Sequence, residues 1–86
     1  MTEILFTKKF IEQLEHFPLS IQKTTYKKVA LFRDNPQHPS LHKHKLHGKL
    51  KDYFAFSITD DVRIVFYYTE SGTIVFVKIG THAIYK

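Results

Sequence analysis

The spacing of hydrophobic residues changes halfway along the chain. In the first half, apolar residues recur every three or four positions, which is the spacing of one face of an α-helix. Two such stripes follow one another, and their members are Phe10, Leu14 and Phe17, and then Ile21, Thr25, Val29 and Phe32. This part of the sequence therefore predicts two amphipathic helices.

Residues that start and stop helices divide the two stripes. Thr7 can cap the first helix, and Pro18 ends it. Ser20 is a candidate cap for the second helix, which ends at Asn35-Pro36. Because very few residues join the two helices, we expect an antiparallel helical hairpin.

The second half of the chain has the period of two that is typical of strands. Residues 53–59 alternate, so that Phe54, Phe56 and Ile58 point one way while Ala55 and Ser57 are among those that point the other way. Two more strands are predicted at 62–69 and 73–79, and a short one at 1–6. The turns between the later strands, at Asp60-Asp61 and Glu70-Ser71-Gly72, are short, so neighbouring strands should be antiparallel.

These elements predict an α+β protein with one domain over residues 1–86. An N-terminal strand and the helical hairpin precede a twisted antiparallel sheet of three to four strands, which packs on the hairpin. One face of the sheet should be covered by the helices. The other face should be open and polar, and is therefore the expected surface for a functional site.

Composition sharpens this picture. A chain of 86 residues needs a core dense in large side chains, and it has eight Phe and five Tyr. It has no cysteine, which excludes disulfides and thiol chemistry and fits a reducing cytosol. We see no signal peptide and no apolar run long enough to cross a membrane, so we expect a cytoplasmic protein. The net charge of +5 favours a polyanion or an acidic partner.

Much of the positive charge lies in residues 41–52, which contain four Lys and three His. This segment can be an edge strand that its lysines protect from aggregation, or a rim that contacts phosphates, and the residue types fit both. The histidines around it also raise the question of a metal site. Because cysteine is absent and the spacing matches no defined zinc pattern, we expect no metal and interpret His38 and His42 as solvated loop residues.

Two polar residues near the later strands are candidates for chemistry. Arg63 interrupts an apolar strand, so it either faces solvent or offers a guanidinium that can grip a phosphate. His82 follows the last strand after Gly80 and Thr81, where it can be a tail residue or a general acid or base. Tyr85 could stack on a base.

Taken in order, these segments resemble the RelE/ParE toxin superfamily, and most closely its YafQ-like and RelE/StbE-like mRNA interferases. The resemblance is carried by residues 44–53 (HKLHGKLKDY), 61–66 (DVRIVF) and 79–82 (IGTH), and it covers nearly the whole chain. It implies the toxin of a type II toxin–antitoxin system that cuts mRNA on the ribosome without a metal or cofactor. The ribose 2′-OH would attack the adjacent phosphate, giving a 2′,3′-cyclic phosphate and a 5′-OH.

The resemblance also implies roles for individual residues. His82 would be the general acid, His44 the base or a phosphate ligand, and Arg63 the group that stabilises the phosphate. Asp61 would orient an imidazole, and Tyr85 would be the C-terminal aromatic residue. The residues expected to contact RNA or the ribosome are Lys43, Lys45, His47, Lys49, Lys51 and Ser57. The implied protein partner is an acidic, partly disordered antitoxin encoded by the adjacent gene.

The sequence departs from the family pattern in two places. Ala55 and Ser57 stand where RelE has lysines, and Ser57 replaces a YafQ-like histidine. Tyr85 follows His82 by three positions, where the family usually has four, which leaves a weakened enzyme as an alternative. Two further alternatives are a ParE-like toxin that inhibits gyrase without catalysis, and a degenerate toxin that only binds its antitoxin.

Overall fold

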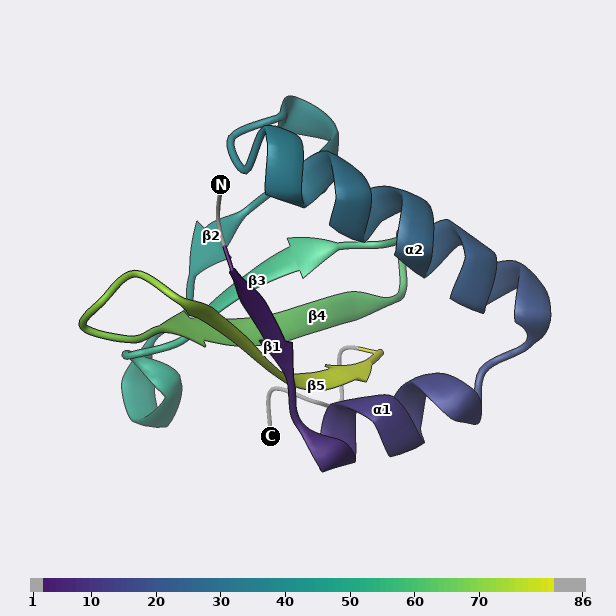
Figure 1. Ribbon diagram of the computed structural model, residues 1–86, viewed down its shortest axis with the longest axis horizontal. Helices are drawn as coiled ribbons and strands as arrows, with labels where there is room; N and C mark the ends of the chain where they lie inside the picture. The colour runs from purple at the N-terminus through teal and green to yellow at the C-terminus, as the bar shows by residue number, and fades with distance from the viewer. Residues whose placement is uncertain (1–2, 82–86) are drawn as a thin grey trace.

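The two sequence patterns fold into helices and strands in the predicted order. The computed structural model describes residues 3–81. The helices are α1 (Lys8–Glu15) and α2 (Leu19–Asp34), with short 3-10 turns η1 (Pro39–Leu41) and η2 (Gly48–Leu50). The strands are β1 (Ile4–Phe6), β2 (His44–Lys45), β3 (Phe54–Ser57), β4 (Arg63–Tyr68) and β5 (Ile74–Gly80) (Figure 1). The α+β class is therefore confirmed. Neither helix of the described residues has the length and apolar composition that a membrane crossing requires.

The strands form one five-stranded sheet in the order β1-β5-β4-β3-β2. The neighbours β3, β4 and β5 are antiparallel, as their short turns predict. The sheet is nevertheless mixed, because β1 pairs in parallel with β5, beginning at Ile4 opposite Ile74. The direction of β1 was missed because no local turn joins it to its partner. Both helices and the other strands separate the two in the chain.

The first helix begins where the sequence predicts. The Thr7 hydroxyl accepts a hydrogen bond from the Phe10 N–H at 3.2 Å and donates one to the Phe76 carbonyl at 2.9 Å. This side chain therefore caps α1 and also joins the start of α1 to β5.

The second helix begins at Leu19, earlier than predicted. Pro18 is its N-cap, and the Pro18 carbonyl accepts the first helical hydrogen bonds, from Ile21 and Gln22. The prediction that Ser20 is the cap is therefore wrong. A proline needs no N–H partner and has its φ already fixed, so it suits the start of a helix.

The two helices cover the same face of the sheet but diverge from the short link between them (Figure 1). Their apolar stripes point at the sheet more than at each other. Phe10 and Leu14 of α1 join the same core as Val29 and Phe32 of α2. The expected hairpin is therefore open, and a hollow lies between its two arms.

Aromatic rings dominate the core beneath the helices. Phe32 of α2 lies parallel to Phe56 of β3, with ring centroids 4.4 Å apart and planes 3° apart. Phe66 and Phe76, from β4 and β5, are fully buried beside them. Stacked and edge-to-face rings pack favourably beyond the area they bury. The alternation predicted for residues 53–59 is confirmed, since Phe56 and Ile58 lie in this core.

The opposite face is less polar than predicted. Leu46, Ala55 and Val65 form a second, smaller buried cluster, against which Leu50 and Tyr53 pack. The segment between β2 and β3 folds over this part of the sheet and shields it from water. The sheet face that lacks a helix, called here the open face, is exposed and polar only beyond this cluster.

A β-bulge in β5 changes which residues face each way. Val65 pairs with Lys78, but the next residue, Phe66, pairs with Phe76, so Val77 has no partner in the register. Phe76 and Ile79 both remain in the core under the helices, whereas Val77 packs against the small cluster of the open face. Bulges commonly redirect side chains near functional sites.

Candidate functional site

A polar cleft of about 400 Å³ lies at the end of the sheet where β3 turns into β4. Its walls come from α2, from the loop after α2, from β2 and from the β3–β4 turn. The polar residues that line it are Lys28, Ser40, His42, His44, Ser57, Thr59, Asp60 and Arg63. Three of the predicted site residues, His44, Ser57 and Arg63, are therefore brought together here.

The sheet register explains this meeting. Ser57 of β3 pairs with Arg63 of β4, which pairs in turn with Gly80 of β5. His44 of β2 pairs with Ala55, two residues before Ser57. Directly paired residues share a face, and Ala55 belongs to the open-face cluster, so these side chains lie on the open face.

His44 is held in one defined tautomer. Its Nδ1 lies 2.9 Å from the carbonyl oxygen of His42, which can only accept a hydrogen bond, so Nδ1 carries the proton. In the neutral ring, Nε2 is then the acceptor. His42 has a left-handed backbone (φ 49°) at the end of η1, and this turn aims its carbonyl at His44. The neutral imidazole can therefore take a proton at Nε2.

Arg63 is anchored to the turn that precedes it. Its Nη1–H donates to the Thr59 carbonyl at 3.2 Å, and the side chain is half-buried. The Thr59 hydroxyl in turn accepts from the N–H groups of Asp61 and Val62, which stiffens the turn. A guanidinium has five donors in a fixed fork, so this contact leaves donors for an anion.

Two residues that line the cleft, Lys28 of α2 and Ser40 of η1, were not predicted from the sequence. Lys28 Nζ lies 3.5 Å from Ser40 Oγ. The Nδ1 of His38 accepts from the Ser40 N–H at 3.2 Å and lies 2.9 Å from its hydroxyl. His38 is thus a half-buried cap of η1 and not a solvated loop residue, which corrects the prediction. One signal for Lys28 was available, because it follows Thr25 by three positions and therefore borders the buried stripe.

Several predicted site residues lie elsewhere. Asp61 is exposed in the β3–β4 turn and does not line the cleft, whereas its neighbour Asp60 does. Lys43 donates to the Tyr68 hydroxyl at 3.3 Å, away from the cleft. Four more of the predicted contact residues are exposed and outside the cleft lining, namely Lys45, His47, Lys49 and Lys51. His82 and Tyr85 lie outside the described residues.

Within residues 3–81, no three side chains of the ligating types His, Asp and Glu come close enough together to hold an ion. The ionisable groups that line the cleft are the imidazoles of His42 and His44, the Arg63 guanidinium, the Lys28 ammonium group and the Asp60 carboxylate. The positively charged groups can bind an anion, and an imidazole beside them can transfer a proton during its reaction.

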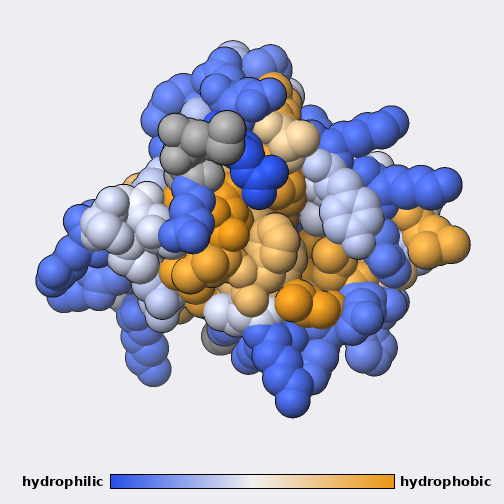
Figure 2. Space-filling model, viewed as in Figure 1, coloured by the Kyte–Doolittle hydropathy of each residue, from blue (hydrophilic) through white to orange (hydrophobic). Residues whose placement is uncertain are grey.

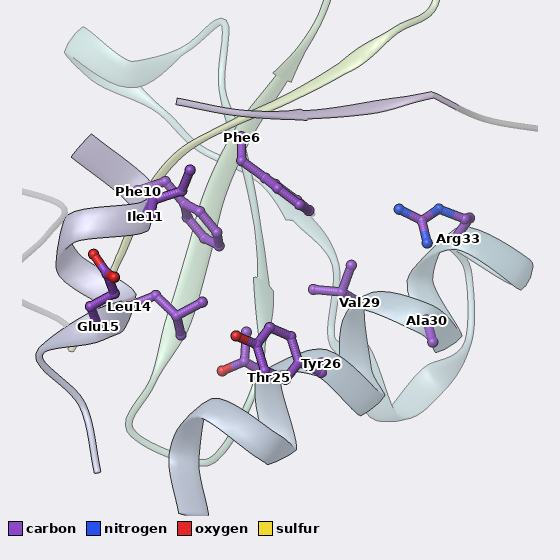
Figure 3. A pocket seen from close by; sticks show the side chains of 10 residues that line it. All are labelled: Phe6, Phe10, Ile11, Leu14, Glu15, Thr25, Tyr26, Val29, Ala30 and Arg33. Carbon is purple, nitrogen blue, oxygen red and sulfur yellow. The ribbon is translucent and has the colours of Figure 1, made fainter. Parts of the chain in front are cut away.

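A second hollow, of about 410 Å³, separates the two helices and is apolar. Figure 3 shows Phe10 and Leu14 of α1 facing Val29 of α2 across it, with Phe6 of β1 at one end. On this side of the molecule, apolar side chains gather in the middle and polar ones surround them (Figure 2). Phe6 is 47% exposed and Tyr26 is 61% exposed. This interhelical hollow therefore leaves large apolar groups uncovered.

Comparison with known proteins places the chain in a family. Residues 2–85 match the family model of the YafQ bacterial toxin of type II toxin–antitoxin systems. No curated protein matches the chain. A metal-bound toxin from Helicobacter pylori is 30% identical, with a TM-score of 0.74 and 98% of each chain covered.

Two structures from Escherichia coli share the fold at lower identity. YafQ is 19% identical with a TM-score of 0.73, covering 99% of this chain and 98% of its own. The DinJ–YafQ complex gives 18% identity and a TM-score of 0.69, covering 98% of this chain and 97% of that chain. The match over residues 2–85 is decisive, and the chain belongs to the YafQ family of toxins of type II toxin–antitoxin systems.

Proposed function

We propose that this toxin is an endoribonuclease that cuts mRNA on the ribosome without a metal. The observation that carries the proposal is that an imidazole, His44, and an anchored guanidinium, Arg63, line the same polar cleft. The 2′-OH of a ribose attacks the adjacent phosphorus, and the bond from phosphorus to the 5′-oxygen breaks. The products are a 2′,3′-cyclic phosphate and a 5′-OH.

Each proton in this reaction has a proposed acceptor or donor. His44 takes the proton of the 2′-OH at Nε2, the ring atom left as acceptor by the hydrogen bond at Nδ1. His82 returns a proton to the leaving 5′-oxygen. Its role rests on the family resemblance and on its place in the sequence, two residues after Gly80, which pairs with Arg63. Two residues of chain span at most about 7 Å.

The charge that builds up on the phosphate needs nearby cations. Arg63 offers a rigid fork that suits phosphate oxygens, and Lys28 of α2 adds a second positive charge to the same cleft. Ser57 pairs with Arg63 and is positioned to donate a hydrogen bond. Asp60 lines the cleft, so it is better placed than Asp61 to orient an imidazole.

The basic residues of the edge segment are proposed to hold the RNA or the ribosome. They are the half-buried Lys43 and the exposed Lys45, His47, Lys49 and Lys51, all of them outside the cleft. Contacts of this kind follow the phosphate backbone and weaken as salt concentration rises. Tyr85 is proposed to stack on a base near the cut.

The proposed protein partner is an acidic antitoxin. Related structures include a toxin–antitoxin complex, DinJ–YafQ, and this chain carries a net charge of +5. The interhelical hollow offers the apolar surface that such a partner would cover, and Arg33 stands on its rim (Figure 3). Replacing exposed Ile11 in this hollow with Glu should weaken antitoxin binding and leave mRNA cleavage intact.

Primer extension on a translated reporter mRNA tests the nuclease directly. Brief induction of the toxin should give discrete cuts within the reading frame. His82→Ala should reduce them by about 10²- to 10⁴-fold, because it removes a proton donor. Lys23→Ala, a change on the exposed surface of α2, is the matched control and should cut normally. Growth arrest without cuts would contradict the proposal and favour inhibition of gyrase.

A further inference from the structure

A groove lies on the open face beside the polar cleft. None of the residues that line this groove also lines the cleft. The groove has a volume of about 270 Å³ and is formed by the start of α1, by η2 and the residue just before β3, and by strands β4 and β5. Its floor consists of Leu50, Val65 and Val77, which belong to or pack against the small cluster of this face. We call it the open-face groove.

The lining of this groove combines an aromatic ring with positive charge. Tyr53 contributes its ring, which is held edge-to-face against Tyr67 at a centroid distance of 5.8 Å. Lys9 of α1 and Lys78 of β5 provide two ammonium groups, and no acidic residue of the described chain lines the groove. Apolar and aromatic surface flanked by cations is the chemistry that binds single-stranded nucleic acid.

The sheet register connects the groove to the cleft. Lys78, Val65 and Ala55 form one row of paired residues across β5, β4 and β3. Gly80, Arg63 and Ser57 form the next row on the same face. Rows two residues apart are separated by about 7 Å, which is the scale of one nucleotide in an extended strand. A strand of RNA with its reacting phosphate at Arg63 would therefore have its next unit over the groove.

The β-bulge is what makes this groove basic. Without it, strict alternation along β5 from Phe76 would place Lys78 on the helix-covered face with the core residues. With it, Val77 and Lys78 both line the groove, while Ile79 returns to the core. The bulge thus adds a cation to the open face without placing a charge among the phenylalanine rings.

We infer that the open-face groove binds the nucleotide next to the scissile phosphate. The base lies against Tyr53 and Leu50, and the phosphate of that nucleotide is bound by Lys9 and Lys78. This inference rests on the proposed function, because it takes RNA as the substrate of the cleft. Continuity with the cleft and the paired cations favour RNA over an apolar peptide.

The test measures binding of a short single-stranded RNA whose 2′-OH groups are methylated, so that it cannot be cleaved. Fluorescence anisotropy at several salt concentrations gives the Kd and its salt dependence. Neutralising one phosphate of a single strand accounts for a slope of about 0.7 in log Kd against log salt. Lys9→Gln combined with Lys78→Gln should lower the slope by about that amount. The exposed pair Lys23→Gln and Lys27→Gln on α2 is the control, with a smaller effect.

Tyr53→Leu tests the base contact while keeping the side chain apolar. Loss of one stacked base is worth about 1–3 kcal/mol, so the Kd should rise by about 5- to 150-fold. The thermal unfolding midpoint of each variant shows whether it is folded. If Tyr53→Leu does not fold, the lysine pair still decides the question, because both lysines lie at the surface of the groove.

The salt slope and the primer-extension assay together distinguish failure of this inference from failure of the proposed function. If the lysine pair leaves the salt slope at the control value, the inference is overturned, even where primer extension shows cleavage. If the pair weakens antitoxin binding but not RNA binding, the groove is a protein contact and the inference is again overturned. A reduced slope supports the groove even if the protein cuts no mRNA.

Discussion

The two faces of the sheet are built from the same strands but differ in how much apolar surface they bury. On the helix-covered face, Phe32, Phe56, Phe66 and Phe76 are all fully buried and their rings pack together. On the open face, a cluster of only three buried residues is followed by the cleft that contains Arg63. Most of the apolar burial, and hence most of the stability, belongs to the first face.

This difference shows how a small chain can carry a polar site on one face of its sheet while the other face supplies the stability. Alternate residues of a strand point to opposite faces, so one strand can supply a core residue and a site residue in turn. Ile64 and Arg63 of β4 are such a pair, the first fully buried and the second half-buried. Changes on one face should therefore alter stability, and changes on the other should alter activity.

The largest expected effect is on the helix-covered face. Phe32→Ala removes a ring that is fully buried and stacked on Phe56. It should lower the free energy of unfolding by about 3–5 kcal/mol, through lost burial and the cavity left behind. Urea denaturation measures this loss. A loss below about 1 kcal/mol would mean that this face is not the main core.

The next effect is on the open face. Arg63→Ala should slow mRNA cleavage by about 10²- to 10³-fold, the usual cost of removing one group that stabilises transition-state charge. Its free energy of unfolding should change by less than about 1 kcal/mol, because the side chain is only half-buried. Arg63→Lys keeps the charge but not the fork, and should restore part of the rate. An unfolded Arg63→Ala protein would contradict the separation of the two faces.

A smaller effect is expected where α1 meets the sheet. Thr7→Ala removes both the cap of α1 and the hydrogen bond to Phe76 of β5. It should lower the free energy of unfolding by about 1–2 kcal/mol, without a direct effect on cleavage. Thr7→Ser keeps the hydroxyl and is the control. Equal stability of the two variants would show that the cap contributes nothing.

The smallest effect should come from His42. The contact that fixes His44 uses the backbone carbonyl of His42, not its ring. Glycine adopts the positive φ of this position easily, so His42→Gly should change the free energy of unfolding by less than about 1 kcal/mol. Cleavage should stay within a few-fold of normal in the primer-extension assay. A large loss of cleavage would give the His42 ring a direct role.

Local patterns predicted most of this fold. The alternation of Phe54, Phe56 and Ile58 identified the core face, and Thr7 and Pro18 identified helix boundaries. The missed features depend on contacts between distant segments. The parallel pairing of β1, the bulge opposite Val65 and the open angle of the helices are of this kind.

The site could be predicted only in part for the same reason. His44, Ser57 and Arg63 were predicted from their residue types and from the resemblance, and the register brings them into one cleft. Lys28 and Ser40 were missed, because they reach the cleft from a helix and a loop that meet it only after folding. The sequence also does not distinguish Asp60 from Asp61, since which of them lines the cleft depends on the shape of the turn.

The central claim is that the polar cleft, which is lined by His44 and Arg63, cuts RNA through its imidazole and its positively charged side chains. Mapping RNA 5′ ends in a translation reaction, with and without prior treatment with a polynucleotide kinase, tests it most directly. The wild-type toxin should create ends that can be ligated only after kinase treatment, as expected for a 5′-OH. A folded His44→Ala variant should lose them by about 10²- to 10⁴-fold. Ends that already carry a 5′-phosphate, or ends that persist unchanged in His44→Ala, would contradict the claim.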